Sequence, residues 1–271
     1  MARLRTPSSQ NSPKQSTISS TNTPQLPSIA VRSDWTLCPS NTVAGVIELY
    51  EQLLPTRIYC SHKVRARPAT EVACRLCSRS AETVQHILAG CPTLAQNKYL
   101  ERHNNALKIL FFEILKDANL IDKVPPWFSQ VKPKPVYEND QFQAYWDVPL
   151  YVEHTEVRAN RIDARFIDHQ QEKVIALEMS CPWIDNRTSK EEEKTAKYAP
   201  LRWEIKRQYP GYDVQQYNII IDLLGGWSTD MEEEMRNLLG SRVITKGVLL
   251  KMQKSVLSSS LNIARTFKAI T

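Results

Sequence analysis

Glycine and long apolar runs are both scarce in this chain of 271 residues. It contains only 7 glycines, and neither G-x-x-x-x-G-K-[ST] nor G-x-G-x-x-G occurs, which excludes the phosphate-loop and dinucleotide-binding classes. No stretch approaches the roughly 18 uncharged apolar residues of a membrane span, and the first residues lack the apolar segment of a signal peptide. We therefore expect a soluble, intracellular protein with no membrane partner, built as one or two small domains.

The number of cysteines and the arrangement of acidic residues exclude two further protein classes. Six cysteines are too few and too unevenly spaced for a secreted disulfide scaffold of this length. No Asp-Asp pair occurs anywhere in the chain, so the metal site of a polymerase is absent. Residues 1–33 contain four basic groups and no acidic group.

Positive charge is concentrated in the first 108 residues. The formal charge of the chain is +6, and residues 57–108 alone carry nine Lys and Arg against three Glu. Residues 109–271 carry a net charge of −1. Such a basic region would attract a polyanion such as nucleic acid through counterion release. The alternative interpretation is an ordinary solvated basic face.

Composition and hydrophobic period divide the chain into five segments. We predict a disordered basic tail at 1–33, a basic helical lead-in at 34–73 that includes a helix at Ile47–Leu54, a zinc knuckle at 74–92, a connector helix at Asn104–Leu120 with a proline-rich linker inside 93–140, and a catalytic domain at 141–271.

The last segment changes from helical period to strand period and back. We predict strands at Val148–Val157, Arg161–Ile167, Lys173–Met179 and Tyr217–Leu224, and helices at Ser189–Gln208, Asp230–Leu239 and Val243–Phe267. This order predicts an α/β fold in which helices flank a mixed sheet.

The motif C-x2-C-x8-H-x4-C is formed by Cys74, Cys77, His86 and Cys91. A tetrahedral zinc ion takes four such donors, and the two-residue gap lets neighbouring thiolates share one metal. The segment has few large apolar residues, so its folding is hard to explain without a metal. The alternative is a set of buried thiols beside an unrelated histidine.

The remaining cysteines have no comparable arrangement. We expect Cys38, Cys60 and Cys181 to be small buried hydrophobic residues.

Two acidic residues interrupt apolar strands of the predicted sheet. Asp163 lies in the Arg161–Ile167 strand and Glu178 in the Lys173–Met179 strand. A hairpin with its turn at 168–172 would place the two acids nearly opposite each other, where they could share one Mg²⁺. A metal held there would neutralise charge on a phosphodiester and activate a water.

Hydrolysis of a phosphodiester also needs a cation near the reacting phosphate. Lys194 and Lys197 lie three residues apart and share one helix face, and Lys173 is the nearest alternative in sequence. The competing interpretation pairs Asp163 with Arg161 or Arg165, and Glu178 with a lysine, as ordinary ion pairs. A third strand acid, Asp222, is expected to cap the turn at Gly225-Gly226.

Taken together, these residues resemble the C-terminal region of the polyprotein of site-specific, R-two-type non-LTR retrotransposons. The resemblance covers roughly residues 50–268. It is carried by the cysteine and histidine motif with His86-Ile-Leu-Ala-Gly-Cys91-Pro92 around it, by Arg102-His103-Asn104, by the Asp163 to Glu178 spacing, and by Lys194 to Tyr198 before a buried strand.

The resemblance implies a fold, an activity and a location. The C-terminal part would be similar to restriction-enzyme-like endonucleases, whose PD-(D/E)-x-K site holds a divalent metal and nicks chromosomal target DNA, which implies a nuclear protein. Asp163 and Glu178 would bind Mg²⁺, Lys197 would orient the water or stabilise the pentavalent phosphate, and Lys194 would hold a neighbouring phosphate. Further nucleic-acid contacts are expected from Arg75, Arg79, Arg102, His103 and Arg161.

The sequence also departs from the family pattern. Ile162 replaces the proline of the motif, and Ser180 stands where E-x-K would place its lysine, which is displaced to the following helix. Pro200 is expected to kink that helix by removing one hydrogen bond. The chain would be an endonuclease fragment without a reverse transcriptase core, which would have to be supplied elsewhere. The alternative function is a catalytically inactive, zinc-dependent nucleic-acid-binding relic.

Overall fold

The computed structural model describes residues 40–62, 72–240 and 242–270. The predicted tail at 1–33 lies outside these residues, as do residues 34–39, Cys38 among them, and 63–71 of the predicted lead-in. Within them, no helix is long and apolar enough to cross a membrane.

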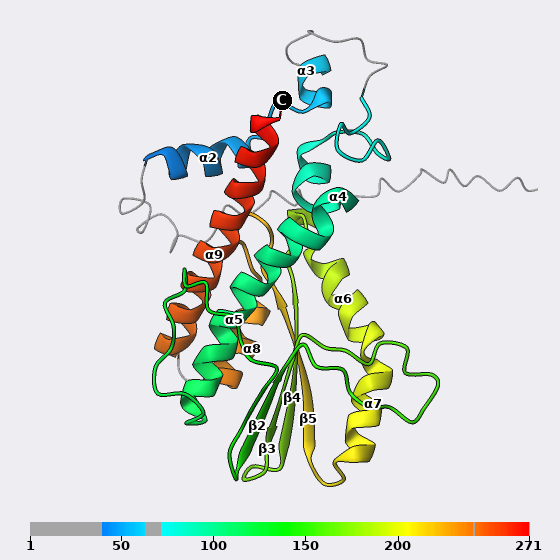
Figure 1. Ribbon diagram of the computed structural model, residues 1–271, viewed down its shortest axis with the longest axis vertical. Coiled ribbons are helices and arrows are strands. Elements are labelled where there is room, and N and C mark those ends of the chain that lie inside the picture. Colours follow the sequence, from blue (N-terminus) through cyan, green and yellow to red (C-terminus); the bar gives the residue numbers. More distant parts are fainter. Residues whose placement is uncertain (1–39, 63–71, 241, 271) are drawn as a thin grey trace, which may run out of the picture.

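A five-stranded sheet forms the centre of the fold (Figure 1). Its strands follow one another in chain order across the sheet. They are β1 (Val136–Glu138), β2 (Phe142–Trp146), β3 (Ala164–Asp168), β4 (Lys173–Ser180) and β5 (Asp213–Ile220). The first four pair antiparallel, and β4 pairs parallel with β5, so the sheet is mixed.

The parallel pair requires a crossover, because a tight turn can join only antiparallel strands. Here the crossover consists of α6 (Arg187–Lys197) and α7 (Ala199–Gln208). Every residue from Val174 to Met179 on β4 is buried, as expected for a central strand that is covered on both faces.

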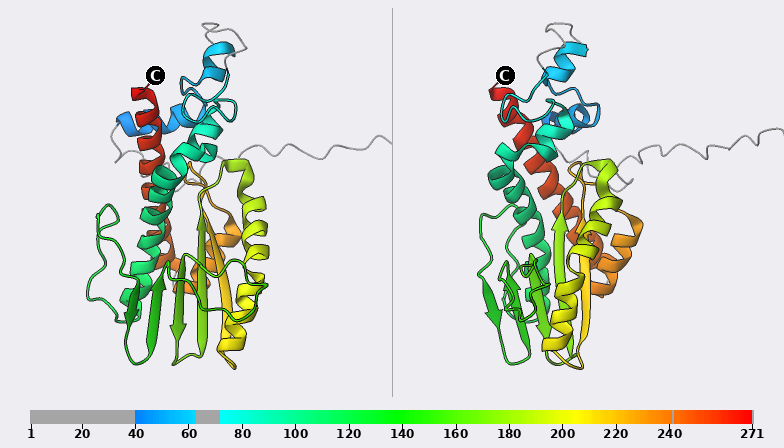
Figure 2. Two further views of the ribbon diagram at one scale, coloured as in Figure 1. Left: turned by 45° about the vertical axis from the view of Figure 1, so that its right-hand side comes forward. Right: turned by 90° about the vertical axis from the view of Figure 1, so that its right-hand side faces the viewer.

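Helices cover both faces of the sheet (Figure 2). On one face, α5 (Leu100–Asp117), α8 (Thr229–Leu239) and α9 (Arg242–Ala269) form the largest apolar core with β3, β4 and β5. On the other face, Tyr198 and α7 pack on Ile167, Val174, Ala176 and Val214 through a second apolar cluster, and α6 lies against β5. The predicted α/β class, a mixed sheet flanked by helices, is therefore confirmed.

The predicted connector helix is part of this core. Leu107, Leu110, Phe111 and Leu115 of α5 are each 0% exposed, and Phe111 contacts Phe166 of β3 at 5.2 Å between ring centroids. The helix therefore supports the sheet.

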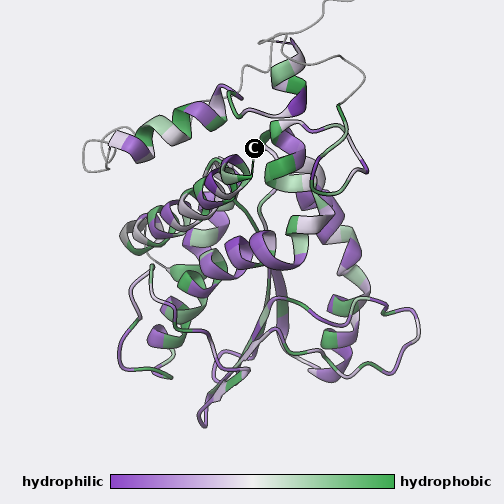
Figure 3. Ribbon diagram, turned by 45° about the horizontal axis from the view of Figure 1, so that its top comes forward, coloured by the Kyte–Doolittle hydropathy of each residue, from purple (hydrophilic) through white to green (hydrophobic). Residues whose placement is uncertain are grey.

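Shorter helices surround the cysteine and histidine motif. They are α2 (Ser40–Tyr50), α3 (Arg57–His62), the π-helical turns η2 (His86–Gly90) and η3 (Ala95–Tyr99), and α4 (Pro92–Leu94). A third apolar cluster joins Val46 and Leu49 of α2 to the motif and to Ile263 and Phe267 of α9. Figure 3 shows that α2 and α9 each carry both apolar and polar residues, as expected for helices with one buried face.

Four predicted elements differ from the structure. The predicted helix Ile47–Leu54 is found earlier in the chain as α2, Ser40–Tyr50. The predicted strand Tyr217–Leu224 is found as β5, Asp213–Ile220, which ends before Asp222.

Residues 148–157 form no strand. Asp147, at φ 53°, ends β2 before them, and Pro149 cannot donate a ladder hydrogen bond. The predicted helix Ser189–Gln208 is divided at Tyr198, because Pro200 cannot continue α6 but is accepted in the first turn of α7.

Candidate metal centre and acidic site

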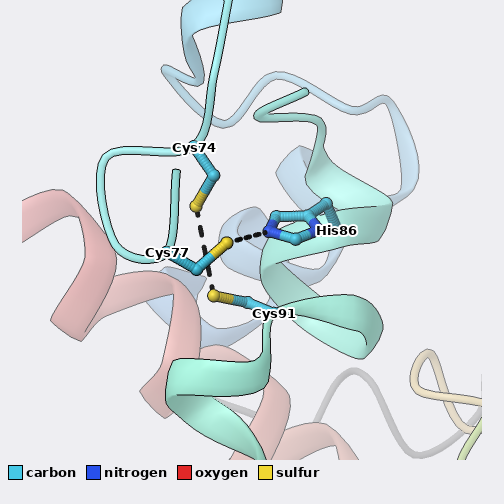
Figure 4. A group of neighbouring side chains, drawn as sticks. All are labelled: Cys74, Cys77, His86 and Cys91. Carbon is cyan, nitrogen blue, oxygen red and sulfur yellow. Dashed lines mark hydrogen bonds between the residues drawn. The ribbon is translucent and has the colours of Figure 1, made fainter. Parts of the chain in front are cut away.

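Cys74, Cys77, His86 and Cys91 converge in one compact cluster (Figure 4). The Sγ atoms of Cys74 and Cys91 are 4.0 Å apart, and Cys77 Sγ is 3.3 Å from His86 Nε2. All four ligand atoms lie within 4.8 Å of one another. Among the described residues, no other group of three or more His, Cys, Asp or Glu side chains converges this closely.

The backbone around the cluster is held by turns and by one buried carboxylate. An isolated bridge pairs Ala73 with Ala81, and Ser78 turns the chain between them at φ 56°. Glu82 is 0% exposed and accepts hydrogen bonds from the backbone N–H of Arg75 at 2.7 Å and from its Nη2 at 2.6 Å. Although burial opposes ionisation, these bonds lower the pKa of Glu82.

The cluster has the donor set and spacing of a structural metal site and could hold a metal ion. Tetrahedral Zn²⁺ with bonds of about 2.3 Å to sulfur places two thiolates roughly 3.8 Å apart, close to the observed separation. Burial raises the pKa of Cys74 to about 11 and lowers the pKa of His86. A neutral imidazole is the form that binds metal, whereas the thiols must lose their protons to bind.

Tyr99 connects the cluster to α5. Its hydroxyl accepts a hydrogen bond from the backbone N–H of Cys91 at 3.1 Å and donates to the carbonyl of Ile87 at 2.7 Å. Burial raises the pKa of Tyr99 to about 12, so the hydroxyl remains a donor. The first turn of α5 is thus fixed to the cysteine and histidine segment.

The two predicted strand acids lie at one end of the β3–β4 hairpin. Ala164 pairs with Leu177 in the ladder, and Asp163 and Glu178 continue the same register just beyond. The backbone N–H of Asp163 donates to Oε2 of Glu178 at 3.4 Å. The hairpin predicted from a turn at 168–172 is therefore confirmed, with the acids opposite each other.

Glu178 lies beneath α6 and is nearly enclosed. Its side chain is 3% exposed, and its Oε1 accepts hydrogen bonds from Lys194 and from the Tyr198 hydroxyl, the latter at 3.1 Å. Lys197 does not contact Glu178 directly, and its Nζ donates to the Tyr198 hydroxyl at 2.9 Å. Lys194 is thus the lysine in direct contact with the acid. Lys173 lies at the opposite end of β4.

Asp163 is held by His103 of α5, which covers the face of the sheet opposite to α6. Its Oδ2 accepts hydrogen bonds from His103 Nε2 at 2.9 Å and from the backbone N–H of Met179 at 2.8 Å. The Asp163 side chain is 22% exposed, so solvent reaches this acid more readily than Glu178. Neither Arg161 nor Arg165 is its partner: Arg161 pairs with Asp147 at 2.5 Å, and Arg165 stacks over Tyr145 at 4.5 Å.

The protonation behaviour of the two acids differs. Burial opposes ionisation of Asp163, but the hydrogen bond and charge of His103 more than offset it, so the pKa of Asp163 is lowered. Burial and the negative charge of Asp163 raise the pKa of Glu178, despite the charge of Lys194. The pKa of His103 is raised because Asp163 outweighs the effect of burial. A second cation beside Glu178 would relieve this like-charge contact.

The predicted nucleic-acid contacts separate into exposed and enclosed side chains. Arg79 and Arg161 are exposed, whereas Arg75 is bound to Glu82 and His103 to Asp163. The prediction for Arg102 is corrected, because this residue is 2% exposed. Its guanidinium donates to Ser260 Oγ at 3.2 Å and to the Cys181 carbonyl at 3.4 Å, which joins α5 to α9.

Three secondary predictions can be placed as well. Asp222 caps the turn as predicted, since its Oδ1 accepts the N–H groups of Leu224 at 2.9 Å and Gly226 at 3.0 Å. Cys60 and Cys181 are partly buried free thiols, and neither belongs to the metal cluster.

Tyr198 had no assigned role in the sequence prediction, and His103 was predicted to contact nucleic acid, not Asp163. Tyr198 joins Glu178, Lys197 and the Arg161 carbonyl through one hydroxyl. His103 reaches an acid 60 positions away, and no local spacing signals such a contact. The position of Tyr198 next to Lys197 was the one available signal.

No protein-family model matches the chain, and no curated protein shows significant sequence similarity to it.

Proposed function

We propose that this protein is a divalent-metal-dependent DNA endonuclease of retrotransposon origin, which nicks a target strand and carries a structural zinc knuckle. The observation that carries the proposal is the meeting of Asp163 and Glu178 from neighbouring strands with Lys194 from the next helix. This arrangement has the order of acid, acid and lysine that a PD-(D/E)-x-K site would have if its lysine were displaced to the helix.

The acids suit a divalent cation in number and environment. Mg²⁺ commonly takes one or two carboxylates and completes its shell with water and substrate phosphate. The hydrogen bonds from His103 and from the Met179 N–H both go to Oδ2 of Asp163, so Oδ1 can face a ligand. Burial and the negative charge of Asp163 raise the pKa of Glu178. A cation bound between the two acids would offset both effects and favour the ionised form of Glu178.

The surrounding residues would position the scissile phosphate. A bound cation would supply charge neutralisation and a more acidic water. Lys194 would keep Glu178 ionised and offer positive charge to the phosphate, and His103 would fix the orientation of Asp163. Arg161 lies at the exposed edge of the site and could exchange its contact with Asp147 for a neighbouring phosphate.

The proposal includes a restriction-endonuclease-like core, a nuclear location and DNA as substrate, with RNA as a further ligand of the knuckle. Because the chain has no Asp-Asp pair, a reverse transcriptase would have to act from another polypeptide. The second candidate function is a catalytically inactive zinc-dependent binder of nucleic acid. The ion pair between Lys194 and Glu178 favours that candidate, because it neutralises Glu178 without a metal.

Nicking of supercoiled plasmid in the presence of Mg²⁺ or Mn²⁺ tests the proposal. We expect Asp163→Asn and Glu178→Gln each to reduce nicking by at least about 100-fold, the range seen when a group that stabilises developing charge is removed. Asp213→Asn is the matched control, since this exposed acid begins β5 at the far end of the sheet. Nicking that persists in both site variants would reject the assigned site.

The same preparations separate the two candidate functions. An inactive binder would show no nicking with either ion, while its affinity for DNA would still fall with rising salt and on removal of zinc.

A further inference from the structure

A separate cavity of about 200 Å³ opens between α5, α9 and the turn at 126–129. Its wall includes side chains from α5 and α9 and contains no strand residue. In Figure 2 the segment that follows α5 runs outside this helix, away from the sheet. The cavity shares no residue with the acidic site or with the cysteine and histidine cluster.

A buried lysine lines this cavity. Lys108 is 6% exposed, and its Nζ donates to Asn105 Oδ1 at 2.9 Å and to the Ser129 carbonyl at 2.6 Å. An ammonium has three donors, so two neutral acceptors leave one donor unused, and the charge is met at longer range by Glu101. Among the described residues, no carboxylate forms an ion pair with Lys108. A buried charge of this kind is stabilised by an anion.

Further charges around Lys108 do not remove its need for an anion. Lys98, whose Nζ donates to Asn262 at 2.9 Å, lines the same cavity, and Lys132 also acts on Lys108. Glu101 is the acid on the wall and is exposed to solvent. Two lysines of the wall, Lys98 and Lys108, against one glutamate give the cavity a net positive charge.

The turn beside the cavity presents two aromatic rings. The N–H of Ser129 donates to the Pro126 carbonyl at 2.8 Å, which fixes Trp127 and Phe128 at the centre of the turn. Their rings meet edge to face at 5.7 Å. Phe128 is 68% exposed, although burying its ring would be favourable. A fixed, exposed ring beside a buried cation is a stacking surface next to an anion site.

We propose that this cavity binds a single-stranded segment of nucleic acid, with a phosphate at Lys98 and Lys108 and a base stacked on Phe128. Single strands are held by this combination of cations along the backbone and aromatic faces for the bases. The serine hydroxyls of α9 that line the wall add donors for phosphate oxygens. A protein partner fits less well, because most residues of the wall are polar or charged, whereas protein interfaces are anchored by a packed apolar centre.

Fluorescence anisotropy with a labelled oligothymidylate tests the inference. A length of about 10 nucleotides lies within the usual site size for a single strand. The full chain is used with zinc present and without added Mg²⁺, so the result does not depend on nicking. We expect Phe128→Ala to weaken binding at least about fivefold, the lower end for loss of one stacked base. Lys98→Gln should weaken binding and reduce the slope of log affinity against log salt by roughly 0.7.

Two control variants remove an exposed aromatic ring and an exposed lysine that lie outside the cavity. Tyr151→Ala removes an aromatic ring that is 80% exposed, and Lys116→Gln removes an exposed charge at the end of α5; both should bind like the unmodified protein. Affinity that is unchanged in Phe128→Ala and Lys98→Gln overturns the inference, as does binding of inorganic phosphate or AMP without binding of the oligonucleotide.

Discussion

The two candidate sites differ in how much of the chain builds them. The cysteine and histidine cluster comes from one short segment, Cys74 to Cys91, whose turns already bring the ligands together. The acidic site combines Asp163 and Glu178 with His103 of α5 and Lys194 of α6, and it exists only when the sheet and both helical layers are assembled.

This difference has a physical consequence. The four donors of the cluster need a metal to hold them together, although Ile87 and Leu88 of the same segment also pack against α2 and α9, whereas the acidic site takes its geometry from the surrounding core. The cluster should therefore be sensitive to removal of the metal, and the acidic site to changes in side-chain pairing.

The largest effect should come from a cluster ligand. Cys91→Ser should abolish binding of one zinc per chain and destabilise the protein by on the order of 5 kcal/mol, part of the roughly 10–16 kcal/mol with which zinc-finger peptides bind the metal. Metal analysis and thermal unfolding measure both effects. Cys60→Ser, a half-buried thiol outside the cluster, should retain the metal. If Cys91→Ser kept its zinc, the cluster would not depend on all four ligands, and its expected greater sensitivity to metal loss would be contradicted.

A smaller effect separates the two lysines of the acidic site. Lys194→Met should destabilise the protein by about 3 kcal/mol, because it leaves the buried Glu178 carboxylate without its cation. Lys197 is exposed, and its Nζ donates to the Tyr198 hydroxyl, so Lys197→Met should change stability by less than about 0.5 kcal/mol. Urea denaturation compares them. The double variant Lys194→Met, Glu178→Gln should recover part of the loss, and equal effects of the two single variants would contradict the pairing.

Arginines near the two sites should behave differently as well. Arg102→Met should cost about 2 kcal/mol, since it removes the hydrogen bonds that a buried guanidinium donates to Ser260 of α9 and to the Cys181 carbonyl after β4. Arg79→Ala, an exposed change near the cluster, should leave stability within about 0.5 kcal/mol and lower DNA affinity instead. Paired denaturation and DNA-binding measurements decide between the two roles. Full stability in Arg102→Met would contradict its role as a core residue.

The smallest effect is a dependence of stability on pH, measured without added Mg²⁺. The pKa of His103 is raised by Asp163 above 6.5, so its stabilisation is fully present below pH 6.5 and is lost as the pH rises through the folded value. Asp163, with its pKa lowered from 3.8, contributes above that pH and loses its contribution in acid. His103→Gln should therefore cost roughly 1–2 kcal/mol near pH 6 and less at alkaline pH. A cost independent of pH would contradict an ionic contact.

The local parts of the molecule could be predicted from the sequence. The cluster follows from the spacing of its four ligands, and the placement of Asp163 opposite Glu178 follows from a short turn at 168–172, which fixes the register. In both cases the determining residues lie within a few positions of one another along the chain.

The distant parts could not be predicted. The burial of Arg102 and the contact from His103 to Asp163 depend on how α5 packs against α9 and the sheet, and neither leaves a pattern in the sequence. The predicted strand at 148–157 failed because apolar alternation is also compatible with a loop that packs Leu150 and Val157 against α7. The strands β1 and β2, which lie between proline and polar residues, were missed.

Because of the Tyr99 hydroxyl, the segment Cys74 to Cys91 cannot be exchanged by itself between proteins. This hydroxyl is bonded to the backbone of both Cys91 and Ile87, and one helical turn later the same chain presents His103 to Asp163. A chimera joined between Pro92 and Leu100 would cut through this connection and disturb the acid on the far side of the helix. Grafting experiments should instead transfer the whole stretch from Ser40 to Asp117 together.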